Sequence, residues 1–306
     1  MNIRRSMQKI SIIILALALL MAAALAPGAI AEDRAAVPSN PQRVVDLTGS
    51  GDVLRIMDIN VVGTTNARSD DPTKLPSYLE NTLAGAKVLG NSYQAGYDIE
   101  AIRALEPDLI LILPQHEAMR KELEQIATTV TVNLTRRSWK SDMLSLGELF
   151  GRRTAVATWL DNYASMSHAL GENIKKAQGK EFRCLALMIS AGQMYAFVDA
   201  GLGGVLFSDL GLGKPKGMSD RMGFNMTTIS LEQLSMLEMD YLFLVGADAD
   251  RRELRGQEQW LKLPVVQKNR VKELPAEPYL GMAYSCVGAD ALCKEIATML
   301  HAKSEG

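Results

Sequence analysis

One helix-to-strand pattern occurs twice in this chain, and it restricts the possible folds more than any other feature of the sequence. DIEAIRALEPDLILIL spans residues 98–113, and SLEQLSMLEMDYLFLV spans residues 230–245. Each copy begins with an amphipathic segment that carries a glutamate near its start, Glu100 or Glu232, and each ends in an apolar run. An amphipathic helix next to a short, continuous apolar run is typical of a parallel sheet covered by helices. The repeat therefore predicts two α/β units of similar plan.

The sequence around the first copy predicts one complete α/β unit. Apolar runs bounded by turn residues predict strands, and they fall at 43–47, 60–66, 87–90, 108–113 and 129–134. Segments with helical periodicity separate several of them, at 49–59, 98–106 and 116–127. Strands that alternate with helices in this way predict a parallel sheet with both faces covered.

The alternation stops in the middle of the chain. Residues 141–178 show no strand pattern: 141–150 predict one helix, and 152–178 predict a longer one of roughly 40 Å at about 1.5 Å per residue. Further on, strands are predicted at 183–190, 240–245 and 270–275, and helices at 203–212, 230–238, 257–267 and 289–302. The predicted fold class is therefore α/β, with two α/β lobes that have parallel central sheets and are joined by one long spanning helix.

Four segments follow from this division of the chain. They are a signal peptide at 1–31, an N-terminal α/β lobe at 32–140, a helical linker with the spanning helix at 141–179, and a C-terminal α/β lobe with a terminal helix at 180–306. The alternative is a coincidental likeness between two helix–strand units of one large sheet. The length of the strandless middle favours two lobes.

The N-terminal segment has the order of an export signal. Basic MNIRRSMQK precedes an apolar run, and small residues follow up to Ala31, so cleavage is expected before Glu32 and the mature protein in the periplasm. A retained membrane anchor is the alternative, because the apolar run is long for a signal. Loss of three basic residues from the total of 33 leaves 30 against 35 acidic residues, a net charge of −5. Since no cysteine lies at the cleavage point, lipid anchoring is not expected.

Composition excludes some classes of function. A hydrophobic content of 47% with 22% charged residues is that of a well-packed globular protein. The net charge is −2 and basic runs do not extend beyond pairs such as Arg136-Arg137 and Arg251-Arg252, which argues against nucleic acid as a partner.

The three cysteines do not form a predicted disulfide framework. Cys286 and Cys293 are seven positions apart in a predicted helix, which places them roughly 10 Å apart along its axis. A disulfide needs Cα atoms about 5.5 Å apart. Cys184 lies in an apolar strand and is expected to be buried. Stability is therefore expected to come from a packed core.

Several motifs resemble one protein family. The pattern xLExLxxLxPDLI in each half, RVVDLTGSGDVL at 43–54, GTTN at 63–66 and GGVLFSDLGLG at 203–213 are similar to the substrate-binding proteins of ABC importers for ferric siderophores, haem and vitamin B12. The resemblance covers essentially the whole mature chain. GTTN, HEAMRKELEQIATTV and NLTRRSW look closest to the ferric-siderophore branch.

The resemblance implies a monomeric carrier rather than an enzyme. It implies two lobes on a rigid helix, a small-molecule iron chelate held between them, and the permease subunits of an ABC importer as partners. The expected ligand is an Fe(III)–siderophore complex, with haem or cobalamin and other corrinoids as alternatives. No cofactor is expected, and no metal bound directly by the protein, because the iron is carried inside the chelate.

The resemblance also assigns a role to the two repeated glutamates. In this family a glutamate on the outer surface of each lobe pairs with arginines of the permease, and Glu100 and Glu232 hold those positions here. Two carboxylates on a stiff frame would guide docking by charge and spacing. The alternative is that each only stabilises the N-terminal end of its own helix.

Ligand-binding residues are expected on loops between the lobes, at the carboxyl ends of strands. Arginine donates paired hydrogen bonds to chelate oxygens, and aromatic rings cover apolar arms. The alternatives are solvated arginines and tyrosines that only cap the core. The predicted residues are Tyr93, His116, Arg136, Arg137 and Trp139 in the first lobe, and Tyr195, Arg221, Tyr279 and Tyr284 in the second.

His116 directly follows a predicted strand, so it is expected at the cleft rim. There it could contact ligand oxygens, or bind haem iron if haem is the cargo. An ordinary surface histidine is the alternative.

Two other classes of function are disfavoured. An α/β enzyme would need a phosphate loop or a nucleophile elbow, but GLGGVLFSDLG matches GxGxxG incompletely and no GxSxG occurs. A receptor for free metal ions would need several histidines, whereas the chain has only His116, His168 and His301. Turnover of a substrate would distinguish an enzyme from a binding protein.

Overall fold

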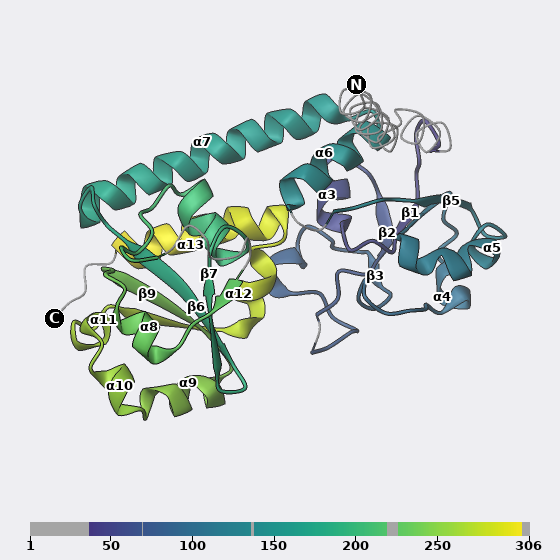
Figure 1. The fold of residues 1–306 in the computed structure, drawn as a ribbon. Helices are drawn as coiled ribbons and strands as arrows, with labels where there is room; N and C mark the ends of the chain where they lie inside the picture. The colour runs from purple at the N-terminus through teal and green to yellow at the C-terminus, as the bar shows by residue number, and fades with distance from the viewer. Residues whose placement is uncertain (1–36, 69, 136–137, 219–225, 302–306) are drawn as a thin grey trace, which may run out of the picture.

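The computed structural model describes residues 37–68, 70–135, 138–218 and 226–301, which form two α/β lobes bridged by a long helix (Figure 1). This confirms the predicted fold class. The predicted signal peptide lies outside the described residues. Among the described helices, none is both long and apolar enough to cross a membrane.

The first lobe contains a five-stranded parallel sheet in the order β3-β2-β1-β4-β5. The strands are β1 (Val44–Asp46), β2 (Val61–Thr64), β3 (Lys87–Val88), β4 (Leu109–Ile112) and β5 (Thr128–Thr131). The helical elements are α3 (Gly51–Ile56), η1 (Ser77–Leu79), α4 (Ile99–Arg103), η2 (Pro114–Met119) and α5 (Arg120–Leu123). The helix predicted at 116–127 is thus a 3-10 helix followed by a short α-helix, and proline occupies its first turn.

The second lobe contains a five-stranded mixed sheet in the order β10-β9-β6-β7-β8. Its strands are β6 (Cys184–Ser190), β7 (Gln193–Phe197), β8 (Met226–Thr228), β9 (Tyr241–Gly246) and β10 (Val271–Pro275). Strands β6, β9 and β10 are parallel as predicted, whereas β7 and β8 are antiparallel additions. Ala191 and Gly192 join β6 to β7 with φ of 49° and 75°, which is the conformation of a tight hairpin turn.

Helices bridge and cover the lobes. The segment between the sheets forms α6 (Trp139–Leu149) and α7 (Arg153–Gln178), and α7 runs along both lobes (Figure 1). The second lobe adds the π-helix η3 (Gly204–Asp209), α8 (Leu231–Ser235), α9 (Asp248–Arg255), α10 (Glu258–Leu261), α11 (Pro264–Gln267), α12 (Ala276–Met282) and α13 (Cys286–His301). The single helix predicted at 257–267 is two short helices, because Pro264 begins a new one.

Apolar side chains fill both faces of each sheet. In β4, Leu109 and Leu111 pack into one core cluster and Ile110 and Ile112 into another, as expected for a strand buried on two sides. The second sheet likewise separates two clusters. Cys286, at the start of α13, packs into the core of the first lobe. The last helix of the chain therefore ties the lobes together.

The three cysteines are free and buried. This confirms that Cys286 and Cys293 do not form a disulfide, and that Cys184 is buried.

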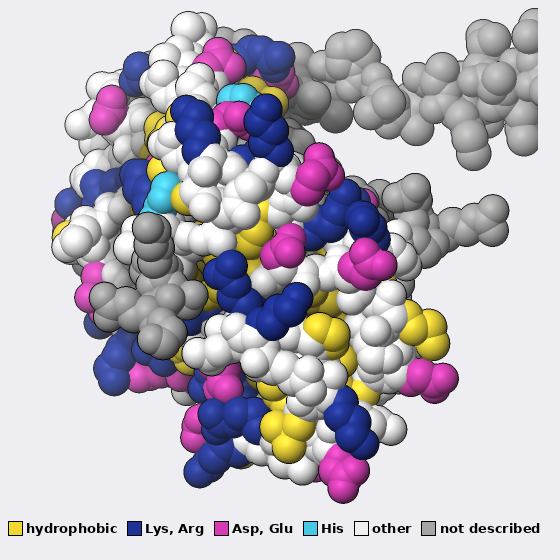
Figure 2. Space-filling view, turned by 90° about the vertical axis from the view of Figure 1, so that its left-hand side faces the viewer, with side chains coloured by type: hydrophobic (Ala, Val, Ile, Leu, Met, Phe, Trp, Pro, Cys, Tyr) yellow, Lys and Arg dark blue, Asp and Glu magenta, His cyan; other side chains and the backbone are white. Residues whose placement is uncertain are grey.

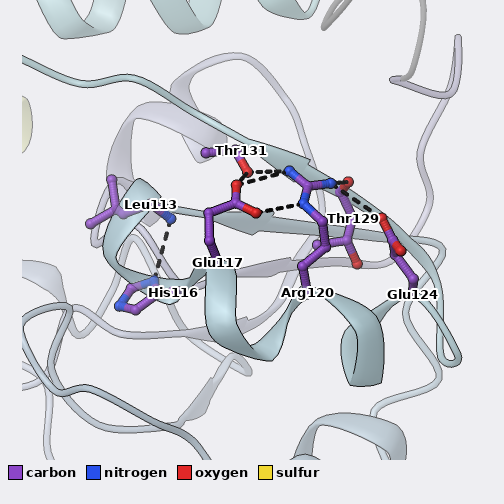
Figure 3. A network of polar contacts seen from close by, with 7 residues as sticks. All are labelled: Leu113, His116, Glu117, Arg120, Glu124, Thr129 and Thr131. Atoms are coloured by element: carbon purple, nitrogen blue, oxygen red, sulfur yellow. Dashed lines mark hydrogen bonds and ion pairs between the residues drawn. The ribbon is translucent and has the colours of Figure 1, made fainter.

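A polar network closes the edge of the first sheet at β5 (Figure 3). Glu117 accepts hydrogen bonds from Arg120 at 2.8 and 3.1 Å and from the Thr131 hydroxyl. Arg120 also donates to the Thr129 carbonyl at 2.9 Å and to Glu124 at 3.3 Å. The hydrogen bonds from Arg120, and then from Thr131, lower the pKa of Glu117 to about 2.

Replacement Glu117→Gln is expected to lower the free energy of unfolding by about 1 kcal/mol at pH 7, since the pair is partly screened by solvent. The folded-state pKa lies below the unfolded one, so the carboxylate stabilises the fold above about pH 4.5. That contribution is lost as the pH falls toward about 2. Urea unfolding at pH 7, 4 and 3 would measure the free energy of unfolding, and the difference between variant and parent should become smaller as the pH falls. The control Glu258→Gln removes a carboxylate from an exposed ion pair with Lys262. Its free energy of unfolding should stay close to that of the parent at each pH. A difference independent of pH would contradict the assignment.

Candidate ligand-binding site

A pocket of about 640 Å³ lies between the lobes. Its volume is within the range of small-molecule sites. Both lobes line it, so a ligand there would contact both. The lining residues of the first lobe and α6 are Thr48, Gly49, Ser50, Asp52, Val53, Thr65, Asn66, Ala67, Arg68, Pro76, Tyr78, Leu79, Asn91, Ser92, Tyr93, Leu134, Trp139 and Asp142, and those of the second lobe are Glu277, Gly281, Tyr284, Ser285 and Cys286.

Asp46 shapes the first wall of the pocket. Its side chain, at the end of β1, is fully buried. It accepts hydrogen bonds from the Thr48 N–H at 3.0 Å, the Thr48 hydroxyl at 2.5 Å and the Ser50 N–H at 2.8 Å. Burial raises the pKa of Asp46, and these donors oppose the rise. The backbone at 48–50 is therefore fixed before any ligand arrives.

Asn66 joins this wall to the loop after β2. Its side-chain oxygen accepts from the Gly51 N–H at 3.0 Å, and its amide donates to the Gly49 carbonyl at 2.8 Å. Gly49 has φ of +75°, and a Cβ there would lie 2.8 Å from the Ser92 hydroxyl oxygen. The TGSGD and GTTN motifs thus form one structural unit that only glycine at position 49 accommodates.

An aromatic cluster lies behind the pocket. Trp139 packs edge-on to Tyr163, with ring centroids 5.2 Å apart, and Tyr163 stacks on Trp159 at 5.6 Å. Lys140 lies over the Tyr163 ring and pairs with Asp209 of η3. Asp209 also accepts a hydrogen bond from the Tyr163 hydroxyl at 2.6 Å. These contacts anchor Trp139, which faces the pocket, to both α7 and the second lobe.

Asp52 connects the lobes on the pocket floor. Its side chain, only 3% exposed on α3, accepts hydrogen bonds from the Ser285 hydroxyl at 2.6 Å and from the Cys286 thiol at 3.2 Å. Burial, and then the carboxylate of Asp52, raise the pKa of Cys286. The thiol is therefore a neutral donor to Asp52.

Two tyrosines, Arg68 and Glu277 also line the pocket. Tyr93 of the first lobe is 77% exposed and Tyr284 of the second is 49% exposed. Burial, and then the neighbouring Tyr93, raise the pKa of Tyr284. Arg68 donates to Asp70 at 2.9 and 2.6 Å. Burial, and then Asp70, raise the pKa of Glu277, while Arg68 lowers it.

Three of the predicted ligand-binding residues, Tyr93, Trp139 and Tyr284, line this pocket. Arg136, Arg137 and Arg221 lie outside the described residues. Leu134 and Trp139, which flank the arginine pair in sequence, are both lining residues. The arginine pair therefore remains a proposal.

Three other predicted residues lie elsewhere. Tyr195 is on β7, in a segment predicted to be a loop, and does not line the pocket. Tyr279 packs against the core of the second lobe, where burial and a hydrogen bond with Glu295 raise its pKa to about 12. His116 is fully buried on η2, where its ring accepts a hydrogen bond from the Leu113 N–H and packs edge-on against Tyr97. The prediction of a rim or surface histidine was wrong.

Other lining residues were not predicted from the sequence, including Asn66, Arg68, Ser92 and Glu277. All four lie on segments that were expected to surround the ligand, so the position of each segment after a predicted strand was the available signal.

A second hollow of about 570 Å³ lies at the other end of the second lobe. Its lining includes Phe182, Arg183, Leu237, Asp240 and Leu263, at the amino ends of β6 and β9. None of the predicted ligand-binding residues that the structure describes lines it. Figure 2 views the molecule from that side, and acidic and basic side chains are interspersed over the surface. The pocket between the lobes is thus the better candidate for ligand binding.

The repeated glutamates lie on separate lobes. Glu100 is in the first turn of α4 and Glu232 in the first turn of α8, and both helices lie below α7 in Figure 1. Both side chains are exposed, and Glu100 has a 3.4 Å contact with Arg103. Asp98 and Ser230 already cap the two helices. Both glutamates nevertheless lie in the first turn, where a carboxylate interacts favourably with the helix dipole. The permease-docking role therefore remains a proposal.

Within the described ranges, no three His, Cys, Asp or Glu side chains are placed to hold a metal ion. Two α/β lobes on a spanning helix, with a polar and aromatic pocket between them, define a two-lobed binding protein.

Comparison with known proteins agrees with this class. The sequence profile of a family described as periplasmic binding protein matches residues 51–278, and the chain belongs to that family. It is 23% identical over 261 residues to an iron-uptake system-binding protein of Bacillus subtilis, covering 81% of this chain and 80% of the relative. It is 31% identical over 150 residues to the ferric enterobactin-binding periplasmic protein FepB of Escherichia coli, covering 45% and 46%.

The fold also matches solved structures. One is a FhuD-fold periplasmic binding protein component of a Fep/Fec-like ferrichrome ABC transporter from Bacillus subtilis. It superposes with a TM-score of 0.73 at 23% identity, covering 87% of this chain and 97% of that one.

Proposed function

We propose that this protein captures a ferric siderophore between its lobes, outside the cytoplasm, and delivers it to the permease of an ABC importer. One observation carries the proposal: a member of the periplasmic binding protein family has a pocket of about 640 Å³ lined by aromatic and hydrogen-bonding side chains from both lobes. The relatives named for iron uptake and for ferric enterobactin support this choice of cargo.

The pocket suits the chemistry of an iron chelate. The oxygen atoms around the iron would accept hydrogen bonds from Ser50, Asn66 and Arg68, and Trp139, Tyr93 and Tyr284 would cover the apolar arms of the chelate. The arginines of the segment between Leu134 and Trp139 would add charge-assisted hydrogen bonds. Iron bound in this way needs no ligand from the protein.

The same lining gives no support to an enzymatic role. The described lining residues include serines, among them Ser50 and Ser285, but no histidine that could serve as a general base for them. Haem ligation by His116 also lacks support, since the ring is fully buried. We therefore propose a carrier without turnover or cofactor, acting as a monomer, with 32–140 and 180–306 as its two lobes.

Titration of the mature protein with iron chelates would test the cargo. Trp139 lines the pocket, so its fluorescence should report occupancy. The panel would be ferrioxamine B, ferric enterobactin, ferric citrate, haem and cobalamin. We expect saturable, submicromolar quenching by one of the three iron chelates ferrioxamine B, ferric enterobactin and ferric citrate, and none by its iron-free form. Arg136→Ala/Arg137→Ala should raise the dissociation constant about tenfold or more.

The matched control for that variant is Arg152→Ala/Arg153→Ala, an adjacent arginine pair at the start of α7 that does not line the pocket. It should bind as the parent does. Quenching by haem or cobalamin alone would leave the family assignment standing and refute the siderophore proposal.

A further inference from the structure

The rim segment, residues 91–93, forms one part of the pocket wall between β3 and α4. Asn91, Ser92 and Tyr93 all line the pocket. Asn91 forms an isolated antiparallel bridge with Asn66, Ser92 is buried, and Tyr93 is 77% exposed. An exposed ring on a short loop depends on the backbone of that loop for its position.

Side chains outside the pocket hold the rim segment. The Gln94 side-chain oxygen accepts a hydrogen bond from the Asn91 N–H at 3.3 Å, and two further contacts come from residues more distant in sequence. The Tyr97 hydroxyl donates a hydrogen bond to the Asn91 carbonyl at 3.1 Å, and the Gln115 amide donates to the Ser92 carbonyl at 2.8 Å. Neither Tyr97 nor Gln115 lines the pocket. Gln115 belongs to η2, so its contact ties the rim segment to the end of β4 rather than to its own neighbours in sequence.

His116 orients the Tyr97 hydroxyl. The imidazole Nδ1 accepts a hydrogen bond from the Leu113 N–H at 3.3 Å (Figure 3), which assigns the proton of the neutral ring to Nε2. That nitrogen lies 3.4 Å from the Tyr97 hydroxyl, and the rings pack edge-on at 5.2 Å. A phenol that accepts from His116 directs its own proton to Asn91. The Gln115 amide nitrogen is 3.3 Å from the same ring nitrogen but donates to Ser92.

We propose that Tyr97, Gln115 and His116 are positioning residues that fix the rim segment, and with it Tyr93, in the conformation that binds the ligand. The inference rests on the proposed function, because it concerns the same pocket. A wall fixed in the free protein loses less conformational entropy on binding than a flexible one. His116 thus acts through Tyr97, without touching the ligand.

The test uses Tyr97→Phe, which keeps the buried ring, and Gln115→Met, which keeps the length of the side chain. Each should raise the dissociation constants for ferrioxamine B and ferric enterobactin, whichever the parent binds, by roughly fivefold, and the double variant by roughly 25-fold. Amide hydrogen exchange should accelerate at residues 91–93 with the urea midpoint little changed. Tyr241→Phe on β9, outside the pocket, is the matched control and should change neither measurement.

The exchange measurement separates this inference from the proposed cargo. If the parent binds no iron chelate of the panel, the cargo proposal fails, and faster exchange confined to 91–93 still supports the positioning role. Exchange equal to that of the parent in both single variants overturns the inference, whether or not affinity falls. If Tyr97→Phe does not fold, Gln115→Met alone decides, because its exposed side chain contributes little to the core.

Discussion

The Glu100→Ala/Glu232→Ala variant is expected to bind its ligand as the parent does and to lose uptake. Both carboxylates are exposed on separate lobes, and neither lines the pocket between the lobes. If each pairs with an arginine of the permease, truncation costs about 2 kcal/mol of docking free energy, so the double variant should dock roughly a thousandfold more weakly. Uptake of a ⁵⁵Fe-labelled chelate in cells that lack the endogenous binding protein would measure the effect.

The same repeated pattern supplies a matched control for this variant. Glu106 and Glu238 hold corresponding positions, three residues beyond the ends of α4 and α8, and both are exposed. Glu106→Ala/Glu238→Ala removes the same charge and should keep uptake. Normal uptake by the Glu100→Ala/Glu232→Ala variant would contradict the docking role. A loss of ligand affinity in that variant would show that these residues act on the pocket instead.

The two-lobed fold could be predicted because its signals are periodic and extend over many residues. The side chains of the apolar run at 109–112 are buried on both faces of the first sheet, and nearly all residues of β9 are buried in the second sheet. The antiparallel strands β7 and β8 were not predicted. The turn between β6 and β7 uses Ala191 at φ of 49°, and alanine is not typical of such a turn. Strand β8 has only three residues, too few for a pattern.

The candidate site was less predictable, because its residues depend on side-chain direction. The analysis expected a cleft surrounded by loops, and Tyr93, Trp139 and Tyr284 do line the pocket. His116 lies only three residues beyond Leu113, on a loop of the kind expected there, yet a 3-10 turn buries it. Tyr279 shares a short helix with lining residue Gly281, but its ring packs against the core. The position of a loop can be predicted from the local sequence. The direction of each side chain on that loop depends on packing with segments distant in sequence.

Gly171→Ala should be among the most destabilising single substitutions in the spanning helix. Helix propensity alone would favour alanine by about 1 kcal/mol. In the structure, however, a Cβ at Gly171 would lie 1.7 Å from the backbone carbonyl oxygen of Leu210, at the end of η3. A backbone atom has no rotamer by which to move away, so α7 must separate from the second lobe. Overpacking of this kind should lower the free energy of unfolding by about 3 kcal/mol.

Equilibrium urea unfolding would measure this loss, with Gly256→Ala as the matched control. Gly256 ends α9 with an ordinary φ of −74°, and the nearest atom to an added Cβ is 3.4 Å away. Its replacement should change stability by no more than about 0.5 kcal/mol. Because α7 also carries Trp159 and Tyr163, which pack on Trp139, Gly171→Ala should weaken ligand binding as well. Parent-like stability would mean that α7 does not contact the 204–210 segment closely.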